Sequence, residues 1–354
     1  MRRWAALRDA LSWGLPIVCL SCSLLPIASQ GNLRAGQWTL TWLSASVGGV
    51  AVVQPPVLRW VGAWTLLLTA LNPCGLSWTV FRWTLAWSLV ASWCVRARPD
   101  PARWLIGLRL LTGIGIAVWG WQAVTDRPLT GLMDSRTTWA NWLTITTPIW
   151  MRGVGWLVAP ILGWMGWQMQ TWALVGGVGW WSGMRWWRAW PSRVAWGIAC
   201  ASLGWRGIGE SFSVRDRLVE WRMVWEGITS SLSAFLFGHG LGGWSVDART
   251  WPRPEPNPAL LPWTLAHQDT LQAWYDGGLV MVLAWAVALG TLAWRITRQR
   301  LWEHPLSWMG VSALAVSWYS VPWHVGPLSL LGAILYGTLW AMTQEVRCGS
   351  GTPA

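Results

Sequence analysis

Long runs of apolar residues without a charged side chain dominate the hydrophobic pattern of the chain. They cover residues 10–33, 35–58, 60–81, 153–184, 277–294 and 305–344, the last interrupted only by His324. Continuous apolar runs of about 18 residues or more are typical of membrane-spanning helices. The pattern therefore predicts an all-α fold, namely a polytopic helical membrane protein with about ten transmembrane helices, give or take about two.

Arginines between the runs orient this predicted protein. By the positive-inside rule, three arginine groups and the N-terminal stretch MRRWAALRD are expected on the cytoplasmic side. The groups are Arg96, Arg98 and Arg103; Arg185, Arg188 and Arg193; and Arg295, Arg298 and Arg300. The run at 153–184 fits either one long tilted helix or two short ones, and this choice inverts the topology on one side of it.

The expected organisation has four parts. Transmembrane helices occupy residues 1–205 and 267–346, a large extracytoplasmic loop occupies 206–266, and 347–354 form a short tail. Most of the 14 acidic residues lie in the loop or shortly after it. The loop also carries apolar residues at helical spacing, which predict an amphipathic helix lying on the membrane surface with tryptophan as its anchor. These residues are Leu218, Trp221, Trp225, Ile228 and Leu232, with Glu220, Arg222 and Glu226 off their face.

Composition narrows the class of protein further. The chain is 53% hydrophobic and 11% charged, whereas soluble domains average about 25% charged residues. The net charge is +12, but the arginines are scattered between apolar runs, which argues against nucleic-acid binding. All 26 basic residues are arginine and 40 residues are tryptophan, biases that a GC-rich genome explains. Cys19 and Cys22 have CxxC spacing without a second ligand pair, so no metal site is expected.

Three motifs follow one another in and after the loop. They read RDRLVEW from Arg215, FGHGLGGW from Phe237 and AHQDTLQAWYDGGL from Ala266. Together they resemble the extracytoplasmic signature of the O-antigen ligase and O-antigen polymerase superfamily. That signature comprises Arg-x-x-x-Trp, a G-x-G-x-G turn, and His-Asn-x-x-Leu-Gln leading into a span. The matching residues are Arg217, Trp221, Gly238, Gly240, Gly242, His267, Leu271 and Gln272, with Gln268 in place of the usual Asn.

The resemblance implies an inverting glycosyltransferase that needs neither a metal nor a cofactor. Its donor is a polyprenyl-diphosphate-linked glycan, and arginines hold the diphosphate while the histidine serves the acceptor hydroxyl. The acceptor is a lipid A-core, a growing glycan or a protein. The implied location is a bacterial inner membrane, with the catalytic loop on the periplasmic side.

The chemistry of the residues agrees with this implication. A guanidinium group binds phosphate oxygens in bidentate fashion and stabilises the charge of a departing diphosphate. Arg217 is the first candidate, with Arg215, Arg152 and Arg206 behind it. Arg217 and Arg215 could instead contact lipid phosphate, and Arg152 and Arg206 could be ordinary charges that flank apolar runs. His267 begins a helix, whose positive end favours a neutral imidazole that accepts a proton. Alternatively, His267 could simply cap the loop.

The remaining candidates concern the glycan and the acceptor. Gln268, Gln272 and Trp221 could contact sugar, or the two glutamines could satisfy loop backbone. The glycine turn (Gly238, Gly240 and Gly242) permits positive φ, so that its N–H groups could face a phosphate or a sugar, or it is a plain turn. His239 within the turn is interpreted as incidental.

A transporter or flippase for lipid-linked glycans is the rival from another class. Arg82 and Arg109, which lie within apolar stretches, are its best evidence, because an intramembrane arginine usually marks function. A non-catalytic membrane scaffold is the third possibility. The acidic residues near His267 favour surface chemistry over both.

Overall fold

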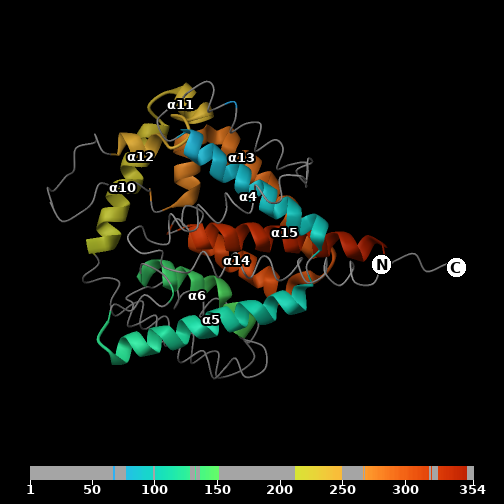
Figure 1. Cartoon of the computed structure of the whole chain (residues 1–354). Helices are drawn as coiled ribbons and strands as arrows, with labels where there is room; N and C mark the ends of the chain where they lie inside the picture. Colours follow the sequence, from blue (N-terminus) through green and yellow to red (C-terminus); the bar gives the residue numbers. More distant parts are fainter. Residues whose placement is uncertain are drawn as a thin grey trace, which may run out of the picture.

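The structure is a computed structural model of the chain. It describes residues 67, 77–98, 100–127, 132, 136–150, 212–248, 266, 268–318, 320 and 326–348. The elements are α4 (Ser77–Ala97), α5 (Pro101–Val124), α6 (Arg136–Trp150), α10 (Phe212–Ile228), α11 (Leu232–Phe237), α12 (Gly243–Asp247), α13 (Asp269–Arg298), the 3-10 helix η1 (Leu301–Glu303), α14 (Pro305–Ser317) and α15 (Gly326–Cys348) (Figure 1). No strand occurs in these residues, so the described part is all-helical, as the sequence predicts. The apolar runs at 10–33, 35–58 and 153–184 lie outside the described residues.

Local sequence explains where two of these helices begin. The Asp100 side chain accepts a hydrogen bond from the N–H of Ala102 at 2.9 Å and caps α5, with Pro101 in the first turn. Imidazole Nδ1 of His304 accepts from the N–H of Leu306 at 3.3 Å at the start of α14. Such caps satisfy N–H groups that have no partner within the helix.

Two described helices are long and apolar enough to cross a membrane, α5 with 24 residues and α13 with 30. Only 33% of the most apolar stretch of α5 and 22% of that of α13 are buried. A core helix of a soluble protein, apolar on all sides, would be mostly buried. Ile106, Leu110 and Ile114 of α5 are each more than half exposed. Both helices therefore present the exposed apolar surface that a bilayer would cover.

The described core forms where α4 packs against α15 and α6 packs against α14. Gly337 of α15 lies so close to the backbone of Ala91 in α4 that a Cβ would not fit. The Trp87 ring packs edge-on against Trp285 of α13, with ring centroids 5.2 Å apart, and lies 5.4 Å from the Tyr336 ring. Close backbone approach at a small residue, filled in by aromatic rings, is a common way to pack apolar helices.

Arg109 has a structural partner inside the apolar helix α5. Its Nε and Nη2 both donate to the carbonyl oxygen of Ile149, at 3.0 and 2.8 Å. Ile149 is the penultimate residue of α6, and the carbonyl end of a helix attracts a positive charge. Arg109 thus caps α6, which accounts for its place without a transport role. Arg82 lies on α4, and its side chain is outside the described residues.

The helices of the predicted extracytoplasmic loop lie apart from the helix ends that were predicted to be cytoplasmic. Figure 1 shows α10, α11 and α12 gathered beside the start of α13, whereas the end of α4 and the start of α5 lie on the opposite side of the view. About 20 residues of α13 follow Gly278, and a helix of this length extends about 30 Å. This length equals the thickness of the hydrocarbon core of a bilayer, about 30 Å.

Candidate functional site

A backbone break at Gly278 divides α13 into a short first part and a long second part. Gly278 has φ 71° and ψ 179°, which is not helical. A Cβ at this position would lie 2.2 Å from the carbonyl oxygen of Leu236 in α11. The sequence therefore needs glycine here both for its positive φ and for space. The break turns residues 269–277 towards α10, α11 and α12 (Figure 1).

The glycine turn between α11 and α12 lies against this break. Gly238, Gly240 and Gly242 have φ of 76°, 96° and 78°, which confirms the predicted positive φ at all three. The N–H groups of His239 and Gly240 donate to the carbonyl oxygens of Tyr275 and Asp276, at 2.8 and 3.0 Å. These two N–H groups bind α13, which agrees with the alternative of a plain turn that the sequence left open.

Side chains reinforce the contact between the turn and α13. The His239 ring stacks on Tyr275 with centroids 4.3 Å apart, and its Nε2–H donates to the carbonyl of Gly227 at 3.0 Å. The Tyr275 hydroxyl donates to Oδ2 of Asp247 at 2.7 Å. His239, interpreted from the sequence as incidental, therefore links α10 to α13. The sequence carried no signal for this role, because its partners lie 12 and 36 positions away from it.

Ala266, the residue before His267, is held by two side chains from different helices. The indole Nε1–H of Trp221 donates to its carbonyl oxygen at 3.0 Å. Its own N–H donates to Oε1 of Gln272 at 2.9 Å. Ala266 is fully buried and Gln272 nearly so. Trp221 and Gln272, predicted as glycan contacts, thus bind the protein backbone beside the candidate base.

Gln268, the residue after His267, occupies the N-cap position of α13. Its side chain is 8% exposed and makes no capping hydrogen bond. Its Oε1 is buried without a hydrogen-bond partner among the described residues. Buried polar atoms are nearly always hydrogen-bonded, so this amide calls for a further partner. His267 itself lies outside the described residues.

The predicted amphipathic helix exists as α10, but its boundaries and its buried face differ from the prediction. It ends at Ile228, and Leu232 begins α11 instead. Leu218 and Trp225, expected on the apolar face, are 57% and 46% exposed. Glu220, expected off that face, is 1% exposed. The correction has a physical reason, since α10 packs on α11 and α13 through the side that carries Glu220 and Ile228.

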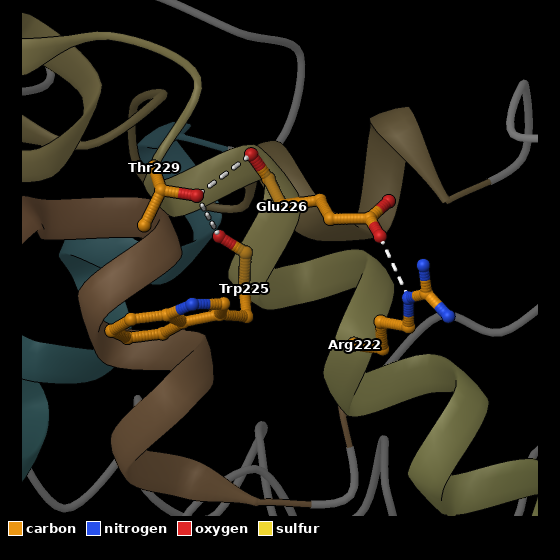
Figure 2. Close-up of polar contacts among 4 residues, drawn as sticks. All are labelled: Arg222, Trp225, Glu226 and Thr229. Carbon is orange, nitrogen blue, oxygen red and sulfur yellow. Dashed lines mark hydrogen bonds and ion pairs between the residues drawn. The ribbon is translucent and has the colours of Figure 1, made fainter.

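The outer face of α10 carries an exposed ion pair. Nε of Arg222 lies 2.8 Å from Oε1 of Glu226, one turn further on (Figure 2). Both side chains are more than half exposed, so the pair contributes little to stability. The Trp225 ring packs edge-on against Trp274 of α13, with centroids 5.6 Å apart. Trp225 lies one turn after Trp221 on the same side of the helix, whereas Arg222 points away from Trp225 (Figure 2).

The candidate arginines are described only in part. Arg217 is partly buried on α10 and lies one turn before Trp221, so both residues share a face of the helix. Arg215 also lies on α10, but its side chain is outside the described residues, as are Arg152 and Arg206 entirely. No group of three or more His, Cys, Asp and Glu within the described residues is arranged to hold a metal ion.

The three motifs therefore come together at the start of α13. The glycine turn contacts Tyr275 and Asp276, and the tryptophan of the first motif contacts Ala266. No protein-family model matches the chain, and no curated protein gives a significant match.

Proposed function

We propose that the chain is a membrane glycosyltransferase of the O-antigen ligase type, a polytopic protein of the bacterial inner membrane with about ten spans. It transfers a glycan from a polyprenyl-diphosphate carrier to an acceptor hydroxyl, with inversion and without a metal. The observation that carries this proposal is the meeting of the three motifs beside His267, although Trp221 and Ala266 are 45 positions apart.

The proposed reaction is a single displacement at the anomeric carbon. The imidazole of His267 takes the proton of the acceptor hydroxyl, whose oxygen attacks the anomeric carbon of the donor sugar. The bond from that carbon to the diphosphate oxygen breaks, and polyprenyl diphosphate leaves with the electron pair. Arg217, with Arg215, Arg152 and Arg206 as further candidates, neutralises the charge that develops on the diphosphate.

The placement of the site supports a reaction at the membrane surface. The exposed apolar length of α13 starts at the break beside the motifs, so a donor with its lipid tail in the bilayer presents its diphosphate at this level. The pairing of Arg109 with α6 accounts for one of the two arginines that favoured a transporter. A repeat-unit polymerase and a protein O-oligosaccharyltransferase share this site and differ only in the acceptor.

The test is release of polyprenyl diphosphate by the purified, membrane-reconstituted protein with EDTA present. The donor is an undecaprenyl-diphosphate-linked oligosaccharide, and lipid A-core, free glycan and a hydroxyl-bearing peptide are offered in parallel as acceptors. His267→Ala and Arg217→Ala should each reduce the rate about a hundredfold or more. Arg222→Ala, which removes an exposed arginine from the same helix, should leave the rate unchanged.

One combination of results would replace this proposal with the rival. In that case the wild type releases no diphosphate with any acceptor, while vesicles containing it move the lipid-linked oligosaccharide across the bilayer. If His267→Ala and Arg217→Ala vesicles do so at the same rate, the motifs do not form a catalytic site.

A further inference from the structure

Ala266 is unusual in the way its backbone is satisfied. Buried N–H and C=O groups generally pair with other backbone groups in helices and sheets. Both polar groups of Ala266 instead bind side chains, Trp221 of α10 and Gln272 of α13. These side chains lie 45 and 6 positions away in the sequence. The chain is thus fixed at this residue from two helices at once.

The planarity of the peptide bond carries this restraint to the next residue. The carbonyl group of Ala266, the nitrogen of His267 and the Cα of His267 lie in one plane. The Trp221 hydrogen bond to that carbonyl therefore orients the plane that ends at the Cα of His267. On the other side, the carbonyl of Gln268 accepts from the N–H of Gln272 at 3.1 Å and joins the helix. Restraints therefore act on the residue before His267 in the sequence and on the residue after it.

We infer that Trp221 and Gln272 are positioning residues for His267 and that neither contacts the glycan. This inference rests on the proposed function, in which His267 takes the acceptor proton. A base must lie within hydrogen-bond reach of the proton that it takes, and a misplacement of about 1 Å can cost about a hundredfold in rate. The two side chains hold the segment that carries the imidazole. They therefore affect kcat, the rate of reaction in the bound complex.

Trp221→Phe tests the first half of the pair, because it removes the indole N–H while keeping an aromatic, smaller side chain. It should lower kcat about tenfold or more, with KM for donor and acceptor unchanged. Trp274→Phe is the matched control. It removes an indole hydrogen bond of the same length, 3.0 Å, which Trp274 donates to the carbonyl oxygen of Phe235. It should leave kcat within about twofold of the wild type, because Phe235 is remote in sequence from His267.

Gln272→Met and Gln272→Glu test the second half. Methionine has a similar length but offers no good acceptor to the N–H of Ala266, so kcat should fall about tenfold. Glutamate keeps an acceptor oxygen whether it is ionised or protonated, and it should restore most of the rate. Amide hydrogen exchange of the peptide that contains Ala266 should accelerate in Gln272→Met and in Trp221→Phe, independently of activity.

The outcomes separate this inference from the proposed function. If wild type and His267→Ala are equally inactive, the proposed function fails, while the exchange data still report whether the two side chains hold the segment. If wild type is active and Trp221→Phe or Gln272→Met raises KM with kcat unchanged, these side chains contact substrate and the inference is wrong. An equal loss of kcat in Trp274→Phe would also overturn it, because general destabilisation would then explain the effect.

Discussion

At the scale of single residues, the side-chain amide of Gln268 is a group to which a bound ligand could supply a missing hydrogen bond. It is buried next to the candidate base, and its Oε1 has no hydrogen-bond partner among the described residues. Because Gln268 directly follows His267 in the sequence, we expect the acceptor hydroxyl of the proposed reaction to come within reach of this amide. A hydrogen bond from that hydroxyl would satisfy the oxygen and orient the nucleophile.

Gln268→Met should therefore weaken acceptor binding without weakening the fold. We expect KM for the acceptor to rise about tenfold, the value of one hydrogen bond. The thermal unfolding midpoint should stay the same or rise slightly, because a buried polar group without a partner has been removed. Steady-state kinetics and unfolding in detergent measure the two effects. A lower midpoint with unchanged KM would show instead that the amide stabilises the loop.

The candidate site was predictable from the sequence as a set of residues but not as a set of roles. The motif pattern placed Trp221, Gln272 and the glycine turn in one site, and the structure does bring them to the start of α13. Among the alternatives that the sequence left open, Gln272 satisfies loop backbone and the turn binds α13, while the backbone contact of Trp221 was not predicted. Spacing along a chain specifies which residue types recur, whereas hydrogen-bond partners 45 positions away depend on how the helices pack.

At the scale of elements, the break in α13 at Gly278 is what lets the loop helices dock. Its positive φ and the close backbone of Leu236 require glycine. Gly278→Ala should destabilise the protein by about 3 kcal/mol or more, the sum of a strained backbone and a steric clash. Gly290→Ala in the same helix is the control, since a Cβ there meets nothing within 4 Å. It should be neutral or stabilise by up to about 1 kcal/mol.

Equilibrium unfolding of both variants under identical conditions measures this difference. The two glycines lie 12 positions apart in one helix, so an effect of alanine on the helix in general would appear in both. Equal stability of the two variants would mean that the break at Gly278 is not required. In that case the glycine turn would not depend on it for its place.

The element boundaries show what hydrophobic pattern can and cannot provide. The apolar run at 277–294 predicted the long second part of α13, because continuous apolarity over a span is a strong signal. Helix was also expected over the first part, 269–277, because His267 was predicted to begin one, whereas the break at Gly278 was not predicted. On α10, the exposure of Leu218 and Trp225 fits a face that was expected to lie on the membrane surface, whereas the burial of Glu220 was not predicted.

At the scale of the whole molecule, the proposed orientation in the membrane depends on two groups of helix ends, one next to the loop helices and one that carries arginines. The loop helices α10, α11 and α12 gather at one end, and the end of α4 and start of α5 lie away from them (Figure 1). Arg96 and Arg103 flank the latter end, and Arg295 and Arg298 lie in the last turn of α13. The positive-inside rule assigns arginine-rich ends to the cytoplasm. The proposal accordingly assigns the site to the periplasmic side, where its lipid-linked donor would have to be presented.

This orientation predicts which engineered cysteines a membrane-impermeant thiol reagent reaches in intact cells. Ser233→Cys places an exposed thiol on α11, and Ala102→Cys places one in the first turn of α5. The first should be labelled in intact cells, and the second only after the membrane is permeabilised, each relative to the parent chain with its own six cysteines. Labelling of both before permeabilisation would contradict a membrane between them. Labelling of Ala102→Cys alone would place the site in the cytoplasm, where nucleotide-linked sugars rather than flipped lipid-linked glycans would be the donors to test.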